Sequence, residues 1–125
     1  MINKKFFVSG MSMLPFLKEK SLIELRYTKD VKLGNIIVFK RKKYVIHRIV
    51  ILNKKMITTK GDNNSFFDKP IRPFKVIAKI IKIDNKDINK YNNKLIARIS
   101  YLQGKINSKN RLINKLFNKI ILILG

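Results

Sequence analysis

The sequence predicts a mainly β fold, in which a small antiparallel β domain is followed by one or two amphipathic helices. Three observations support this prediction. β-branched and alternating apolar runs dominate the first two thirds of the chain, turn residues separate these runs, and a helical period replaces them near the end. We therefore expect a β domain over residues 1–86 and a basic helical tail over residues 87–125.

Each predicted strand is bounded by residues that favour turns. Gly34 with Asn35 marks one turn, a run of four basic residues marks a reversal over 40–43, and Asn53 with Lys54 suits a tight hairpin. Glycine, asparagine, aspartate and two prolines indicate an irregular loop over 61–73. The expected strands cover residues 6–8, 21–27, 36–39, 44–52, 55–59 and 74–83.

Two segments of the tail have a helical period. In the first, the apolar stripe is formed by Ile88, Tyr91, Leu95, Ile99 and Leu102. We expect Gly104 to interrupt this helix. In the second, the apolar positions are Leu112, Ile113, Leu116, Phe117, Ile120 and Ile121, and a separate stripe carries Arg111, Lys115 and Lys119. Such helices either pack on the β domain or a partner, or lie on an anionic bilayer.

The charge and the composition limit the partners and the cofactors. Twenty-nine basic residues against seven acidic ones give a net charge of +22, which favours anionic partners. An anionic membrane surface reached through residues 105–124 is one candidate, whereas the lack of a recognisable reading motif disfavours nucleic acid. Cysteine is absent and there is one histidine, so we expect no metal site and no cofactor. The oligomeric state stays open.

The hydropathy of the chain bears on its location. No apolar run reaches the roughly 18 residues that a spanning helix needs, and no secretory signal peptide is recognisable at the start. We therefore expect a cytoplasmic protein, with peripheral contact at the cytoplasmic face of the membrane as an alternative.

Four residues in three separate segments are candidates for catalysis. Ser12 lies in a turn, His47 is the only histidine of the chain, and Asp62 and Asp68 lie in the polar loop. A serine hydroxyl is a poor nucleophile until a base accepts its proton, and an imidazole oriented by a carboxylate is such a base. Alone, each of these residues is more often structural than catalytic.

The residues around Ser12 are candidates for substrate binding. Gly10 lets the backbone bend and lets a substrate strand approach closely. Met11 and Met13 are apolar neighbours that would line a pocket, and Pro15 restricts the exit from the turn. The backbone N–H of Ser12 is the first candidate for stabilising an oxyanion.

Four segments within residues 5–83 resemble the signal peptidase I superfamily, which also contains the self-cleaving SOS-type repressors. Residues 9–15 (SGMSMLP) are similar to the serine box of that superfamily, and residues 33–39 (LGNIIVF) to its Gly-Asp-Ile/Val-Val strand, with Asn35 in place of the usual aspartate. Residues 45–49 (VIHRI) are similar to the strand that carries the base, and residues 59–64 (TKGDNN) to the Gly-Asp-Asn box, which Asp68 follows.

This resemblance implies a signal-peptidase-like β catalytic domain. Because histidine stands before arginine where bacterial members have lysine, it further implies the Ser-His-Asp type of the archaeal and endoplasmic-reticulum enzymes. Ser12 would be the nucleophile and His47 the general base. Asp68 would orient His47, with Asp62 as the second candidate for that role. The expected activity is that of a serine endopeptidase that processes leader or signal-type peptides, bound as an extended strand.

Two other functions remain as alternatives. One is a repressor-like self-cleaving module, against which His47 in place of lysine argues. The other is a catalytically inactive basic module that binds an anionic membrane or nucleic acid, which the net charge favours.

Overall fold

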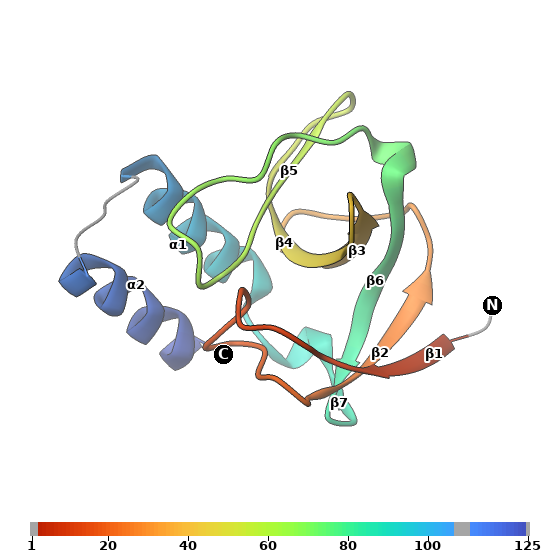
Figure 1. Cartoon of the computed structure of the whole chain (residues 1–125), viewed down its shortest axis with the longest axis horizontal. Coiled ribbons are helices and arrows are strands. Elements are labelled where there is room, and N and C mark those ends of the chain that lie inside the picture. The colour runs from red at the N-terminus through yellow and green to blue at the C-terminus, as the bar shows by residue number, and fades with distance from the viewer. Residues whose placement is uncertain (1–2, 107–110, 125) are drawn as a thin grey trace.

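The computed structural model describes residues 3–106 and 111–124, which form a sheet and two helices (Figure 1). The elements are, in order, β1 (Asn3–Phe7), β2 (Leu22–Tyr27), β3 (Ile36–Lys40), β4 (Tyr44–Leu52), β5 (Ile57–Lys60), η1 (Pro73–Lys75), β6 (Val76–Ile83), β7 (Lys86–Asp87), η2 (Ile88–Lys90), α1 (Asn93–Ile106) and α2 (Arg111–Leu124). The predicted fold class, mainly antiparallel β with two helices at the end, is therefore confirmed.

The sheet has the strand order β1-β2-β6-β3-β4-β5, with β7 paired to β6, and every pairing is antiparallel. Strand β3 lies inside this order and is buried on both faces. Ile36 and Val38 enter one core cluster, whereas Ile37 and Phe39 enter the other. A strand that is covered on both sides is apolar throughout, which explains the continuous run at the start of β3.

The six predicted strands are present, but β1 begins three residues earlier than predicted, β5 begins two residues later, and β7 was not predicted. Two further differences have a clear local cause. Strand β4 has the expected bounds. The first strand ends at Phe7 and not at Val8, because the chain turns away there towards Ser12, although Val8 still donates its N–H to the Ser21 carbonyl at 2.9 Å. Phe74 belongs to η1 and not to β6, because Pro73 begins a short 3-10 turn.

Helix α1 corrects two details of the expected tail. Gly104 does not interrupt the helix, which continues to Ile106, and the ring of Phe67 occupies the space that a side chain at position 104 would fill. The buried side of α1 consists of Ile96, Ala97, Ser100, Gln103 and Gly104, so the expected apolar stripe is displaced. Ile88 and Tyr91 precede the helix, and Leu102 is half exposed.

Helix α1 packs against β4 and β5, and α2 packs against α1 (Figure 1). A boundary between residues 86 and 87 stays a prediction. Within residues 3–106 and 111–124, no helix combines the length and the apolar character needed to cross a membrane.

Candidate active site

Ser12 lies in the turn that connects β1 to β2. Gly10 has φ +93°, a conformation that glycine adopts readily and L side chains rarely do. The Leu14 N–H donates to the Met11 carbonyl at 3.1 Å and closes the turn. The chain can therefore reverse immediately before the serine.

The loop after β5 holds this turn in place. The Asn63 N–H donates to the Ser12 carbonyl at 2.8 Å, and the Asn63 side-chain amide donates to the Met11 carbonyl at 3.1 Å. A Cβ at Gly61 would lie 2.6 Å from the Ser12 carbonyl oxygen, closer than such atoms approach. Glycine at this position thus permits the contact between the two loops.

His47 connects Ser12 to Asp68. Its Nε2 lies 3.0 Å from Ser12 Oγ, and its Nδ1 lies 2.5 Å from Asp68 Oδ2. Thr59 Oγ1 donates to the same carboxylate oxygen at 2.7 Å, and the Asp68 N–H donates to the Thr59 carbonyl at 2.9 Å. Strand β5 therefore fixes the carboxylate that contacts the imidazole.

This arrangement assigns the tautomer of His47. A carboxylate accepts hydrogen bonds and donates none, so the proton of the neutral ring belongs on Nδ1. Nε2 then carries the lone pair and accepts from the Ser12 hydroxyl. His47 is 8% exposed, so little water competes for either bond.

Asp62 is bonded to Arg48 and not to His47. Arg48 Nε and Nη2 donate to the Asp62 carboxylate at 2.9 to 3.2 Å, and both residues are fully buried. Arg48 Nη1 also donates to the Gly34 carbonyl and to Asn93 Oδ1, and the guanidinium lies 4.6 Å from the centre of the Phe16 ring. The two aspartates of the loop thus have different partners on adjacent residues of β4.

Lys60 is a second fully buried cation. Its ammonium group donates to the Gly61 carbonyl at 3.0 Å, and to Ser100 Oγ and Gln103 Oε1 at 2.8 Å. Burial lowers the pKa of Lys60 from 10.5 to about 8, although the two nearby aspartates act in the opposite direction. Lys60 therefore joins the loop of the candidate site to α1.

We expect Lys60 to make the protein more stable as the pH rises from about 8 to about 10.5. The lowered pKa means that the unfolded chain holds more protons than the folded chain in this range, and stability rises with pH wherever that is so. The full effect is about 3 kcal/mol in the free energy of unfolding. Urea denaturation at both ends of the range measures it. In Lys60→Met the rise should be absent, and an equal rise in that variant would assign it to other groups.

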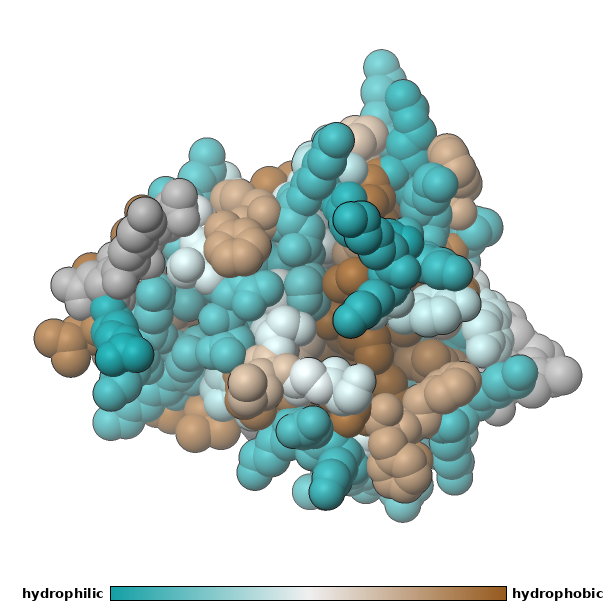
Figure 2. All heavy atoms as spheres, viewed as in Figure 1, coloured by the Kyte–Doolittle hydropathy of each residue, from teal (hydrophilic) through white to brown (hydrophobic). Residues whose placement is uncertain are grey.

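A groove of about 660 Å³ opens beside Ser12 and His47, which both line it. Its walls are mainly apolar and include Phe7, Val8, Ile23, Leu25, Val38, Tyr44 and Ile46. Figure 2 shows this hollow, with hydrophobic residues inside it, between the end of β1 and the β3–β4 hairpin. The groove has the size and the lining of a site for apolar side chains.

The three substrate-binding candidates differ in their positions. Gly10 lies on the groove, and among the described residues beyond its two chain neighbours no atom lies within 4 Å of the position that a Cβ would take there. Met13 also lines the groove and is buried in the core below it. Met11 is 63% exposed and lies outside the groove walls.

Four residues that hold the site together were not among the predicted site residues: Thr59, Arg48, Lys60 and Asn63. Arg48 directly follows His47 and Asn63 directly follows Asp62, whereas Thr59 and Lys60 lie two or three residues before Asp62. A basic residue within a buried strand could have indicated two of them. Arg48 lies in β4 before a run of apolar residues, and Lys60 ends β5, whose four residues are all buried. Nothing in the sequence indicated which partners would neutralise them.

The comparisons with known proteins give one family. No curated protein and no solved structure matches the chain. The model of the Peptidase S24-like family matches residues 5–81, more than half of the sequence, and this range includes Ser12, His47, Asp62 and Asp68. The matched range begins within β1 and ends within β6, and it includes all of β2, β3, β4 and β5. The chain therefore belongs to the Peptidase S24-like family.

Proposed function

We propose that this protein is a serine endopeptidase in which Ser12 is the nucleophile, His47 the general base and Asp68 the residue that orients the base. The observation that carries the proposal is the continuous hydrogen-bonded chain from Ser12 Oγ through both nitrogens of His47 to Asp68 Oδ2. Family membership supports the same class of chemistry.

The proposed reaction starts when Ser12 Oγ attacks the carbonyl carbon of the peptide bond and its proton passes to His47 Nε2. Asp68 stabilises the imidazolium that forms, and the Ser12 N–H is the first candidate donor to the oxyanion. His47 then gives its proton to the leaving amine. Water, activated by the same imidazole, hydrolyses the acyl-enzyme and restores the serine.

A serine–lysine pair is a less favourable assignment for this chain. Lys60 is buried at the end of β5, but its ammonium group is engaged with Gly61, Ser100 and Gln103. At the base position on β4 the chain has His47, which lies in hydrogen-bonding range of Ser12. This favours the Ser-His-Asp type of the archaeal and endoplasmic-reticulum signal peptidases.

We infer that the substrate is a leader or signal-type peptide that lies in the groove as an extended strand. Gly10 leaves room for a backbone beside the nucleophile, and the apolar walls suit aliphatic or small side chains near the cleaved bond. Asp62 supports the loop in this scheme and takes no part in proton transfer.

A fluorophosphonate probe tests the proposal without a known substrate. We expect the wild-type protein to be labelled at Ser12 and Ser12→Ala to remain unlabelled, as intact-mass and peptide mass spectrometry would show. Incubation with a proteome-derived peptide library should yield new termini only with the wild type.

Two results would assign the chain to the alternatives. A folded wild type that neither takes up the probe nor cleaves peptides would indicate an inactive binding module. Shortening of the wild-type chain itself, in the absence of other peptides and not in Ser12→Ala, would indicate self-cleavage.

A further inference from the structure

Helix α2 exposes a row of large aliphatic side chains. We define its outer face by Leu116, Leu122 and Ile123, which are 59%, 55% and 75% exposed. Only Ile121 is buried on the opposite side. In Figure 2, hydrophobic side chains project from the lower left edge of the molecule, where α2 lies in Figure 1. Such a row on one helix is uncommon on a surface that only water covers.

Basic residues lie among and beside the side chains of this outer face. Arg111, Lys115 and Lys119 are exposed on the same helix, which has no acidic residue. The whole chain carries a net charge of +22. An occupant of the outer face must therefore present apolar material and negative charge together.

Three kinds of occupant can be compared on this basis. A second copy of the chain would bring another +22 against the first, and the two would repel each other. Nucleic acid supplies negative charge but leaves aliphatic side chains without apolar contacts, since its interfaces are polar. An anionic bilayer supplies acyl chains below phosphate groups and matches both features.

We propose that the outer face of α2 binds the surface of an anionic phospholipid bilayer. The helix lies parallel to the surface, with Leu116 and Ile123 among the acyl chains and its lysines at the headgroups. This inference concerns a surface outside the catalytic residues and does not depend on the peptidase activity.

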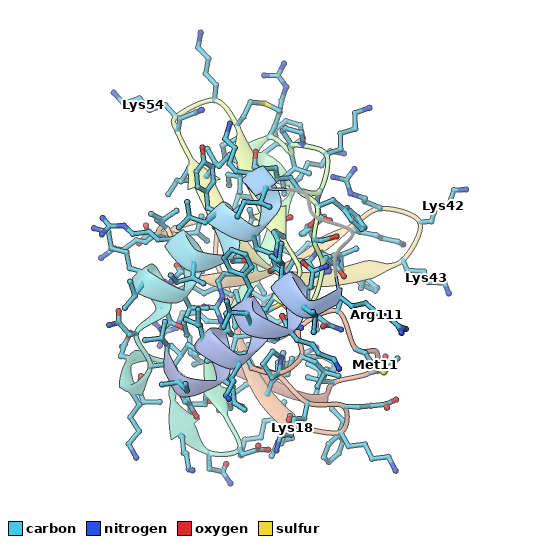
Figure 3. All side chains as sticks on the ribbon, turned by 90° about the vertical axis from the view of Figure 1, so that its left-hand side faces the viewer. Met11, Lys18, Lys42, Lys43, Lys54 and Arg111 are labelled. Atoms are coloured by element: carbon cyan, nitrogen blue, oxygen red, sulfur yellow. The ribbon has the colours of Figure 1, made fainter. Side chains whose placement is uncertain are left out.

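The candidate site is linked directly to this helix. Asn118 of α2 donates its side-chain amide to Asn63 Oδ1 at 3.0 Å, and Asn63 in turn holds the Met11 and Ser12 carbonyls. In Figure 3, α2 faces the viewer, and Arg111 and Met11 project from the same side of the molecule. Membrane binding through α2 would thus bring the Ser12 turn close to the bilayer surface, where a membrane-associated peptide would meet it.

Vesicle sedimentation tests the proposal, with all variants in a Ser12→Ala background so that catalysis plays no part. The protein should sediment with vesicles of phosphatidylglycerol mixed with phosphatidylcholine and far less with phosphatidylcholine alone. Leu116→Asp should weaken this binding at least about tenfold, because it removes one buried aliphatic group and adds repulsion from anionic lipid. Phe74→Asp is the matched control, since Phe74 is 61% exposed and lies in η1 before β6, far from α2.

A second pair of variants tests the contribution of charge to vesicle binding separately from that of apolar contact. It also keeps the test valid if Leu116→Asp disrupts the helix. Lys119→Glu should weaken binding to the anionic vesicles more than Lys54→Glu does. Lys54 lies in the β4–β5 hairpin (Figure 3), and the two substitutions change the net charge by the same amount. Equal binding within both pairs would overturn the proposal. So would a lipid-free dimer that Leu116→Asp dissociates, because the outer face would then belong to a second copy.

Discussion

Replacing His47 with alanine is expected to slow the labelling of Ser12 by a fluorophosphonate at least about 10³-fold. The proposed reaction gives the serine proton to His47 Nε2, which is 3.0 Å from Ser12 Oγ. Without the imidazole the hydroxyl must react at its own low nucleophilicity. The measurement is the second-order rate constant of labelling, which needs no identified substrate.

Asp68→Asn should produce a similar loss with very little change of shape. An asparagine amide can donate to His47 Nδ1, which would favour the tautomer that has its proton on Nε2. That nitrogen could no longer accept from Ser12. Labelling of either variant at the wild-type rate would exclude the Ser12–His47–Asp68 chain as the source of reactivity.

Asp62→Asn is expected to lower the free energy of unfolding by about 3 to 5 kcal/mol. Arg48 and Asp62 are both fully buried and form a bidentate pair. Removing one charge leaves the guanidinium without its counter-charge in a region that excludes water, and this costs more than the pair itself contributes. Urea denaturation, with the midpoint and slope fitted together, measures the effect.

Asp68→Asn is the matched control for this prediction, because it makes the same chemical change in the same loop. The imidazole of His47, unlike the guanidinium of Arg48, carries no permanent charge that must be balanced, so we expect a smaller loss, of about 1 kcal/mol. The double variant Arg48→Met/Asp62→Leu should recover much of the stability lost in Asp62→Asn, since it removes both charges of the buried pair together. An Asp62→Asn protein that unfolds at the wild-type urea concentration would contradict the role given to this pair.

The sequence was sufficient to predict most of the strands, although not their order in the sheet, because each strand is specified locally. Alternation in β2 and the continuous apolar run in β3 reflect one covered face and two covered faces, respectively. The turn residues between them also act over only a few positions. The candidate site could be predicted in the same way. Ser12, His47 and Asp68 each lie in or beside a short contiguous segment, and the order of these segments along the chain indicated the site.

The buried side of α1 could not be predicted by the same means. Hydropathy assigned Leu102 to the covered stripe, whereas the structure buries Ser100 and Gln103 and leaves Leu102 half exposed. These polar residues are inside because Lys60 needs hydrogen-bond partners where it is buried. The local sequence predicted that Gly104 would interrupt the helix, because it does not show that Phe67 packs against this position. That contact joins segments far apart in the chain.

By itself, the sequence determined the strands, the turns and the three residue types that a serine peptidase requires, because these depend on neighbours in the chain. Only the tertiary structure decided which aspartate meets His47. Asp62 and Asp68 are both loop carboxylates near the end of β5, and nothing in their local sequence distinguishes their roles. The distinction arises from the pleat of β4, which directs adjacent side chains to opposite faces, so that His47 meets Asp68 while Arg48 meets Asp62 on the other side.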